Sequence, residues 1–287
     1  MKNIIWLASY PKSGNTWFRI FLSNLLDDKE DPADINKITS THGIASARHI
    51  FDEITGIEAS DLSHDEADLL RPGLYNIISE EAKRTLFIKV HDAYTYLPDK
   101  SPLFPPSASK GVIYIIRNPL DVAVSYANHN SCTVQKSIDM MGDRNHGLCT
   151  KNRRLINQLR QKMGNWSNHV LSWNEAPEHK LHVMRYEDMK QSPVETFSSA
   201  IKFAEFDFDG KAVVEAIKKS SFEELQKQEK EKGFKEKAAD SPSFFRKGEP
   251  GSWREQLTPE QAQQIIKENS VVMKKFGYLT EAGEIVY

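Results

Sequence analysis

The chain has 287 residues, and its 38 basic and 40 acidic residues give a formal charge of −2. Its 39% apolar and 27% charged residues are typical of a globular protein with a full core, and the near-neutral charge argues against general binding to nucleic acids or membrane surfaces. No stretch reaches the roughly 20 apolar residues that cross a bilayer, and Cys132 and Cys149 have neither metal-ligand nor disulfide spacing. We therefore expect a single reduced, cytoplasmic domain over residues 1–287.

The start of the chain predicts a strand, a turn and a helix in close succession. Residues 3–9 are a short apolar run typical of a buried parallel strand, and residues 15–26 place apolar side chains at helical spacing. Residues 30–83 are polar and are expected to be mostly helical. Within them, Ser63 and Glu66 predict a capping box, and Arg71-Pro72-Gly73 predicts the end of a helix.

The middle and end of the chain alternate strands with helices. Residues 85–90, 111–116 and 181–186 predict strands, and Asn118 predicts the cap of a helix that begins at Pro119. Further helices are expected at 151–174, 193–204, 210–219, 221–230 and 259–275. Residues 231–252 are polar, with glycine, proline and lysine, and predict a mobile lid loop. The alternation predicts an α/β fold with a central parallel sheet flanked by helices.

The segment 10–17, between the first strand and the first helix, could hold a phosphate. A strand-to-helix turn directs backbone N–H groups and the positive end of the helix dipole at one point. Lys12 adds a charge, Ser13 and Thr16 add hydroxyl groups, and Gly14 lets the backbone approach an anion. The lysine precedes the glycine, so the order differs from that of a nucleotide-triphosphate loop. The alternative is a solvated lysine in an ordinary turn.

A second candidate phosphate site follows the strand 111–116. Arg117 stands at the carboxyl end of this strand, where open α/β sheets bind ligands. Ser125 lies two helical turns beyond Asn118 on roughly the same face, so a long arginine and a helix hydroxyl can converge on one phosphate. The alternatives are an arginine in a salt bridge and a serine bonded inside its own helix.

Two further segments carry candidate chemistry. Arg246 and Lys247 lie between glycines in the 231–252 loop and could close over an anion, although a solvated loop is the alternative. Lys89 and His91 alternate along the strand 85–90 and its end, so they share a face. A histidine at the carboxyl end of a parallel strand is well placed to be a general base, although a single histidine is more often structural.

Together these segments resemble the sulfotransferases that use 3′-phosphoadenosine 5′-phosphosulfate (PAPS), especially the cytosolic and bacterial soluble members. Segment 10–17 resembles the family's 5′-phosphosulfate loop, 117–125 its 3′-phosphate motif, and 246–253 its closing Arg-Lys-Gly loop. Lys89-Val90-His91 falls where the family has its Lys-x-His with the catalytic base. The motifs follow in family order from residue 10 to residue 253, so the resemblance implies the P-loop-like sulfotransferase fold over nearly the whole chain.

The resemblance implies in-line transfer of a sulfuryl group from PAPS to a hydroxyl, or less often an amine, of a small molecule or natural product, without a metal ion. It implies that His91 takes the acceptor proton, Lys12 stabilises the leaving phosphate, and Lys89 assists at the sulfuryl group. Ser125 would hold Lys12 away until the acceptor is bound. The nucleotide-binding residues that it implies are Lys12, Ser13, Gly14, Asn15, Thr16, Trp17, Arg117, Ser125, Tyr186, Ser221, Phe222, Arg246, Lys247 and Gly248.

Two other functions stay open at this point. A P-loop kinase or NTPase would need an acid at a strand end to hold magnesium, and Asp92 is the candidate. A nucleotide-binding module without chemistry is the second. The acceptor is not identified, because residues 30–80 and 130–175 match no acceptor pocket. A homodimer is also left open, since the short dimerisation motif of many animal members is not evident after Trp253.

Overall fold

A computed structural model of the chain describes residues 2–27, 29–151, 156–238 and 240–287. Its contacts divide the chain into two compact units, and each unit combines segments that are distant in the sequence. The first unit consists of Met1–Tyr10, His42–Tyr114 and Asp143–Val183, and the second consists of Pro11–Thr41, Ile115–Gly142 and Met184–Tyr287.

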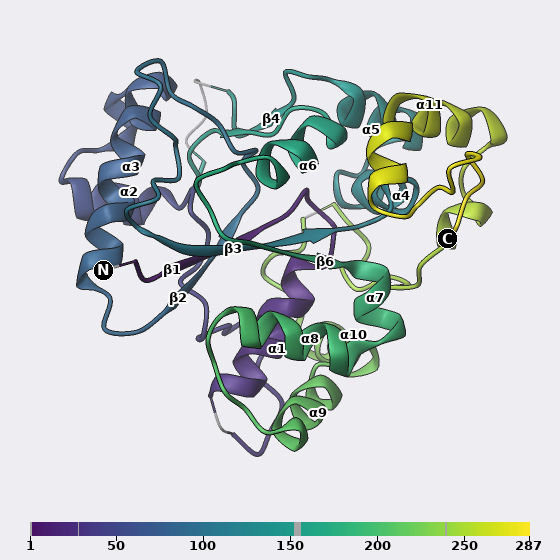
Figure 1. The fold of residues 1–287 in the computed structure, drawn as a ribbon, viewed down its shortest axis with the longest axis horizontal. Coiled ribbons are helices and arrows are strands. Elements are labelled where there is room, and N and C mark those ends of the chain that lie inside the picture. Colours follow the sequence, from purple (N-terminus) through teal and green to yellow (C-terminus); the bar gives the residue numbers. More distant parts are fainter. Residues whose placement is uncertain (1, 28, 152–155, 239) are drawn as a thin grey trace. The chain divides into compact units, whose positions relative to one another are not determined.

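Four strands form one sheet in the order β2-β1-β3-β6 (Figure 1). Their bounds are β1 (Ile4–Ala8), β2 (Leu86–Val90), β3 (Ser109–Ile116) and β6 (Leu181–Arg185). β1 pairs in parallel with both β2 and β3, and all of its residues are buried, as an apolar run in a central strand requires. The predicted parallel sheet is therefore confirmed.

The first unit packs two of its helices on one face of this sheet. Its elements besides the strands are α2 (Arg48–Thr55), η1 (Ala59–Asp61), α3 (His64–Glu81), β4 (Gly147–Leu148), β5 (Gln161–Lys162) and α6 (Trp166–Asn174). Trp6 of β1 meets Tyr75 of α3 edge to face, and Tyr114 of β3 contacts His169 of α6. Trp6 and Tyr114 lie on the same face because Trp6 pairs with Val112, two residues before Tyr114.

Two predictions for the first unit are wrong. The helix α3 does not end at Pro72 but continues through it to Glu81, although the predicted capping box at Ser63 is present. Its buried face holds the helix together across a residue that usually costs about 3 kcal/mol in a helix interior. The long helix predicted over 151–174 is also wrong for the described residues, because only α6 is helical. Gly164 has a left-handed φ of 64°, and Asn165 caps α6, so the helix begins there. Residues 152–155 lie outside the described part.

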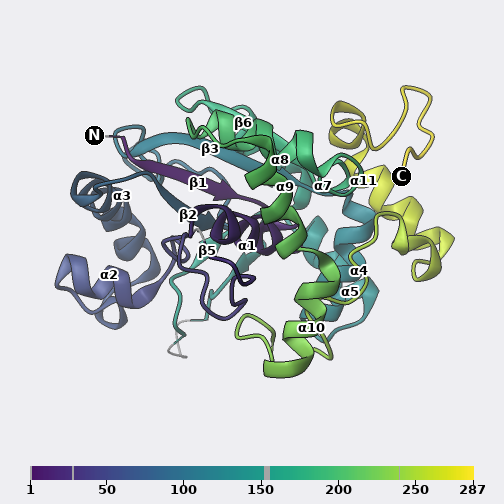
Figure 2. The ribbon, with the colours of Figure 1, turned by 90° about the horizontal axis from the view of Figure 1, so that it is seen from below.

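The second unit is built from helices. They are α1 (Asn15–Leu26), α4 (Pro119–His129), α5 (Val134–Gly142), α7 (Tyr186–Gln191), α8 (Pro193–Phe203), α9 (Gly210–Lys219), α10 (Phe222–Lys232), η2 (Ser252–Glu255) and α11 (Pro259–Lys275). α9 packs against α1 and α8, and α8 against α7 (Figure 2). α11 packs against α4 and α5, which also contact each other. The helices predicted after residue 190 are confirmed, as is the cap at Asn118.

The segment after α10 is more apolar in its contacts than its composition suggests. Phe234 and Phe245 are both buried in a cluster with Ile20, Ile35 and Leu225. The predicted lid segment is therefore anchored by aromatic side chains at two points. None of the helices in the described part is long and apolar enough to span a bilayer.

Candidate functional site

The loop between β1 and α1 has the backbone of an anion-binding turn. Lys12 and Gly14 both adopt left-handed conformations, with φ of 69° and 106°. Gly14 is also required for space, because an added Cβ would lie 2.7 Å from the ring of Tyr186. Gly14 caps α1 without a side-chain hydrogen bond, and the buried hydroxyl of Ser13 has no hydrogen-bond partner among the described residues. This loop therefore presents a helix N-terminus and a donor to a negatively charged group.

Arg117 follows β3 directly and lies against the same loop. Its Nη1 donates to the carbonyl oxygen of Lys12 at 3.1 Å, and its guanidinium lies 4.2 Å from the ring centre of Tyr186. The side chain is buried, yet Nε has no hydrogen-bond partner in the described part of the chain. An arginine that keeps unused donors in a buried position is suited to a phosphate.

The closing loop around Gly248 meets the same tyrosine. The hydroxyl of Tyr186 donates to the carbonyl oxygen of Gly248 at 2.7 Å. Gly248 has a φ of 66°, and an added Cβ would come within 2.4 Å of Phe222. Trp17 lies edge-on to Tyr186 and donates from Nε1 to the carbonyl oxygen of Ser220 at 2.9 Å. Three of the predicted nucleotide-binding residues, the aromatic Trp17, Tyr186 and Phe222, thus gather around the two loops.

Arg246 adds a second guanidinium near Arg117. Burial and then the charge of Arg117 lower the pKa of Arg246 from its usual value. Its Nη1 donates to Oε1 of Gln256 at 3.0 Å, which is a neutral partner. Asp121 and Glu255 oppose this shift, and an anion bound beside the two guanidinium groups would oppose it further. We call Lys12, Ser13, Arg117 and Arg246 the cationic cluster.

Two other predicted nucleotide residues of this unit have partners within the protein. Lys247 forms an ion pair with Glu255, and Ser221 caps α10 by accepting from the N–H of Glu224. Ser125 is half-buried on α4. The ammonium of Lys12 lies 3.5 Å from the ring centre of Phe244, a residue of the lid segment.

The first turn of α1 contacts the lid segment through polar groups. The Thr16 hydroxyl donates to Oε2 of Glu236 at 3.4 Å, and Arg19 forms an ion pair with Oε1 of the same carboxylate at 2.7 Å. Asn15, at the start of α1, is buried. The lid segment is thus connected to the phosphate loop by Glu236 as well as by Phe244.

Asp121 was missed by the sequence reasoning and joins two predicted motifs. It is buried in the first turn of α4 and accepts from the N–H groups of Gly251 and Trp253 at 2.7 and 3.0 Å. The Ser252 hydroxyl donates to it as well, at 3.1 Å. Asp121 therefore fixes the end of the closing loop to the helix that follows Arg117. The available signal was an acid in the first turn of a capped helix, but its partners lie about 130 residues further on.

Glu187 is a second missed residue, next to Tyr186. It accepts from the backbone N–H of Asn118 at 3.0 Å and from the hydroxyl of Tyr278 at 2.9 Å. Burial raises the pKa of Glu187 above its usual value. Because Asn118 follows Arg117, this carboxylate fixes the arginine's strand end beside Tyr186.

The candidate base belongs to the first unit. His91 follows β2, and its Nδ1 lies 2.8 Å from the carbonyl oxygen of Ser9, an acceptor, so Nδ1 carries the proton. This tautomer places the ring's lone pair on Nε2, where a general base needs it. Ser9 lies three residues before Lys12 in the chain. Lys89 is half-buried, and its backbone pairs with the segment around Gly43 and Ala45.

The backbone around His91 is held by two elements of the first unit, α6 and β5. The Nε2–H of His169 donates to the carbonyl oxygen of His91 at 3.1 Å, and the Trp173 indole donates to that of Asp92 at 2.9 Å. The N–H of Ala93 donates to the carbonyl oxygen of Lys162 at 2.7 Å. Burial lowers the pKa of His169 to about 4, so this ring is neutral and serves as a support.

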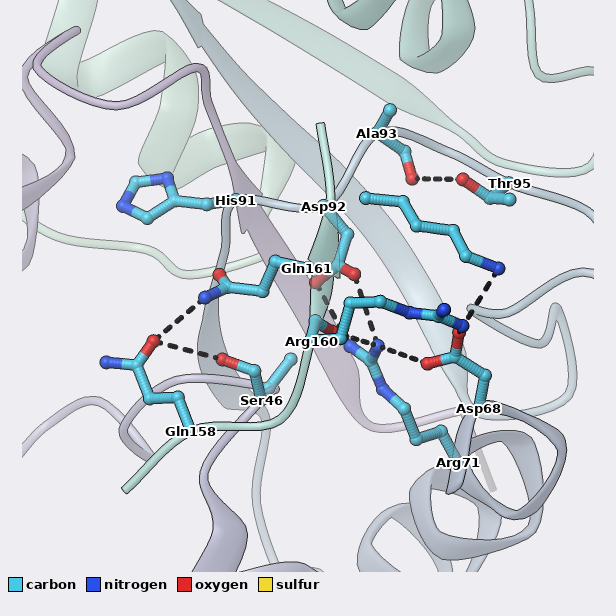
Figure 3. Close-up of polar contacts among 12 residues, drawn as sticks. Ser46, Asp68, Arg71, His91, Asp92, Ala93, Thr95, Gln158, Arg160 and Gln161 are labelled. Carbon is cyan, nitrogen blue, oxygen red and sulfur yellow. Dashed lines mark hydrogen bonds and ion pairs between the residues drawn. The ribbon is translucent and has the colours of Figure 1, made fainter. Parts of the chain in front are cut away.

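Asp92 does not have the surroundings of a metal ligand. Its two oxygens accept from Nη1 and Nη2 of Arg71 at 3.1 and 3.0 Å, as Figure 3 shows. Burial raises the pKa of Asp92 although Arg71 opposes the shift. Burial also works against the charge of Arg71, but Asp92, Tyr75 and Asp68 together raise the pKa of Arg71 well above its usual value. The acid on which a magnesium-dependent kinase or NTPase would depend is therefore occupied.

A separate hollow of about 400 Å³ lies on the outer side of α6. It is lined by Tyr94, Tyr96, Asn168, Leu171, Ser172, Glu175 and Ala176. The helix residues in this set recur at one face of α6, whereas His169 and Trp173, which contact the backbone at His91 and Asp92, lie on another face. His91 does not line this hollow.

Comparisons with known proteins identify the family of this chain. The family model described as a sulfotransferase domain matches residues 2–277. A flavonol 3-sulfotransferase from Flaveria bidentis is 27% identical over 92% of this chain and 80% of its own length. Cytosolic sulfotransferase 13 from Arabidopsis thaliana is 28% identical over 92% of this chain and 74% of its own length. A solved structure of retinol dehydratase with androsterone and the inactive cofactor PAP has the same fold, with a TM-score of 0.64, 18% identity, and coverage of 95% of this chain and 81% of that one.

Proposed function

Because the chain belongs to the sulfotransferase family, we propose that it transfers the sulfuryl group of PAPS to a hydroxyl, or less often an amine, of a small molecule or natural product. The observation that carries this proposal is the cationic cluster. Arg117 and Arg246 lie close enough for one to lower the pKa of the other, and Arg117 contacts the loop that carries Lys12. Such a cluster fits a ligand with several negative charges, as a doubly phosphorylated nucleotide has.

The aromatic side chains support the adenosine part of the donor. Trp17, Tyr186 and Phe222 surround the two loops whose glycines allow close approach. Flat apolar rings stack with a purine base, and their edges exclude water from it. We propose that Arg117 and Arg246 bind the 3′-phosphate, with Lys247, Gly248, Ser125 and Ser221 nearby. Residues 12–17 bind the 5′-phosphosulfate.

In the proposed reaction, the acceptor oxygen attacks sulfur in line with the departing phosphate oxygen. Nε2 of His91 takes the acceptor's proton as the new O–S bond forms, and the electrons of the broken S–O bond stay on the phosphate. The Lys12 ammonium stabilises that developing charge, and Lys89 assists at the sulfuryl oxygens. A loose transition state of this kind depends mainly on positioning and on charge stabilisation, so we propose that no metal ion is needed.

The acceptor class and the lid are part of the same proposal. One related protein is named for a flavonol and one solved structure holds androsterone, so we propose a hydroxyl on a ring system as the acceptor class. We propose that residues 231–252 form the lid, since Phe244 contacts Lys12 and Gly248 contacts Tyr186. We place the reaction in the cytoplasm, as the name of the Arabidopsis relative suggests.

The test compares two nucleotides that differ only in the 3′-phosphate. Calorimetry would measure the binding of adenosine 3′,5′-bisphosphate and of AMP to the wild type and to Arg117→Ala. Charge-assisted hydrogen bonds contribute about 1.5–3 kcal/mol each, so we expect Arg117→Ala to weaken the bisphosphate by roughly 10–100-fold and AMP much less. Equal loss for both nucleotides would contradict the assignment of Arg117.

A transfer assay separates the remaining alternatives. Labelled PAPS is incubated with a panel of phenolic and alcoholic acceptors, with EDTA in one arm and magnesium in the other. We expect transfer in both arms at the same rate. Loss of transfer in EDTA would favour a metal-dependent enzyme, and nucleotide binding without transfer to any acceptor would favour a binding module.

A further inference from the structure

A buried ion pair lies directly next to the candidate base. Arg71 of α3 holds both carboxylate oxygens of Asp92 with both Nη atoms, at 3.1 and 3.0 Å. The two side chains are 0% and 1% exposed. Figure 3 shows Arg71 reaching Asp92 on the side opposite to the imidazole of His91. A two-point contact of this kind fixes direction as well as distance.

The guanidinium is itself held on its other sides. Its Nε donates to the hydroxyl of Tyr75 at 2.9 Å, and that hydroxyl donates to the carbonyl oxygen of Ala45 at 3.0 Å. Nη1 also reaches Asp68 at 3.3 Å and the carbonyl oxygen of Arg160 at 3.3 Å. Arg71 therefore cannot turn without breaking several hydrogen bonds at once.

The network continues to the surface from Asp68. Arg160 contacts Asp68 and the exposed Asp65, and Lys162 lies 3.2 Å from Asp68. The three cations and three carboxylates balance, so the network has no unpaired charge to offer a ligand. Figure 3 shows the side chains of Arg71 and Arg160 directed toward Asp68.

A buried pair of this type contributes little net stability. The cost of removing both ions from water cancels most of their attraction, and apolar replacements are often as stable. What the pair supplies here is a fixed position for Asp92, whose backbone continues from His91. The carbonyl groups of His91 and Asp92 are also fixed by α6, so the carboxylate completes the support from α3.

We propose that Arg71 and Asp92 are positioning residues for the general base. They hold the backbone at His91 so that Nδ1 stays on the carbonyl oxygen of Ser9 and Nε2 keeps one direction toward the acceptor hydroxyl. This inference rests on the proposed role of His91 as the base. A displacement of about 1 Å in a reacting group can cost 10²-fold in rate, so the loss of this support reduces kcat.

The experiment separates positioning from folding by removing both charges together. Arg71→Met and Asp92→Val are made singly and as a double variant, and each is assayed for transfer at a temperature well below its Tm. Arg71→Met leaves the buried carboxylate of Asp92 without its cation, and Asp92→Val leaves Arg71 with Asp68 as its remaining carboxylate partner, so both lose Tm and kcat. The double variant recovers Tm toward the wild type, but we expect its kcat to stay at least tenfold low. Its KM for PAPS and its affinity for the bisphosphate stay within twofold.

A matched control removes an ion pair of the same network one step further from His91. Arg160→Met breaks the contacts with Asp68 and Asp65 but leaves the pair of Arg71 with Asp92 in place. It lowers Tm while kcat stays within twofold of the wild type. Arg71→Lys is the conservative variant, which keeps the charge but loses the two-point contact. We expect it to recover Tm more fully than kcat, and this comparison decides the matter if the double variant does not fold.

The outcomes are distinguishable from a failure of the proposed function. If kcat recovers together with Tm in the double variant, or in Arg71→Lys when the double variant does not fold, while His91→Ala is inactive, the pair is only structural and the inference is overturned. If His91→Ala keeps wild-type kcat, the base assignment fails, and the inference fails with it. If kcat stays low while Tm and nucleotide affinity recover, the inference is supported.

Discussion

The cationic cluster of the second unit and the pair of Arg71 with Asp92 in the first unit differ in how fully their arginines are bonded within the protein. In the second unit, Arg117 keeps a buried donor without a partner among the described residues, and Arg246 lies near it with a lowered pKa. In the first unit, Arg71 has both oxygens of Asp92, and the surrounding charges balance. A buried donor without a partner is costly unless a ligand supplies the acceptor. The region with the unused donor therefore indicates a binding site, and the fully bonded region indicates a support.

The largest expected effect tests whether the transfer reaction depends on His91, which lies next to Asp92. His91→Ala removes the group that takes the acceptor's proton, and a general base supplies about 10²–10⁴-fold in rate. We expect kcat to fall by that factor. Affinity for the bisphosphate should change less than twofold, because the cationic cluster is untouched. Steady-state kinetics with labelled PAPS and calorimetry measure the two quantities.

His91→Gln is the matched variant for this measurement. Its amide nitrogen can still donate to the carbonyl oxygen of Ser9, but it has no basic nitrogen at the other end. It should be as inactive as His91→Ala. A glutamine variant within a few-fold of the wild type would show that His91 supports the loop and does not take the proton.

The next effect concerns His169, which belongs to the support beneath His91. Its pKa is about 4 in the folded chain because of burial, against a usual value of 6.5. Between these values the unfolded chain binds a proton that the folded chain does not, so stability falls as the pH drops from 6.5 to 4. The loss should approach about 3 kcal/mol at the acid end of this window. Urea unfolding at several pH values measures it.

The control for this prediction is His169→Gln. A glutamine does not titrate in this range, so the variant should have a flatter dependence of the free energy of unfolding on pH. Other partly buried histidines titrate in both proteins, and the comparison removes their contribution. An unchanged slope in His169→Gln would assign the acid sensitivity to another group.

A smaller effect is expected at Asp121, the carboxylate that joins the closing loop to α4. Asp121→Asn keeps the shape but turns an N–H group toward one of the donors from Gly251, Ser252 and Trp253. We expect a roughly tenfold weaker affinity for the bisphosphate, because the loop that carries Arg246 is less fixed. The KM for the acceptor should not change. Equal changes in both constants would indicate a general loss of structure.

The sequence predicts a residue's role when that role depends on neighbouring residues in the chain, and not when it depends on distant partners. The residues of the cationic cluster lie at strand ends and in short motifs, so Lys12 and Arg117 could be identified by their position alone. Gly14 and Gly248 could also be expected, because left-handed turns near a ligand favour glycine. Asp121 and Glu187 could not be identified, since their roles depend on partners more than 60 residues away.

The support in the first unit was hidden for a related reason. Arg71 stands beside Pro72 and Gly73, which locally predict the end of a helix, and the buried face of α3, which includes Leu74 and Tyr75, overrides that signal. The basic composition of 151–174 predicted a helix in the same way, whereas Gly164 and Asn165 start α6 later. Pairing between distant charges is a property of the fold, so a sequence shows the charges without their partners.

The smallest effect is expected at Lys247. It compares a cation that has a carboxylate partner with its neighbour Arg246 in the same loop, whose hydrogen-bond partner is neutral. Lys247 forms an ion pair with Glu255, and its side chain is 43% exposed. To bind a phosphate, Lys247 would have to leave Glu255. At this exposed position the interaction of Lys247 with a phosphate and its interaction with Glu255 differ little in free energy. Lys247→Met should therefore weaken the bisphosphate by less than about threefold, far below the loss expected for Arg117→Ala. A loss as large as that of Arg117→Ala would mean that Lys247 leaves Glu255 when the nucleotide binds, and that pairing within the unliganded chain is a poor guide to which cations hold the ligand.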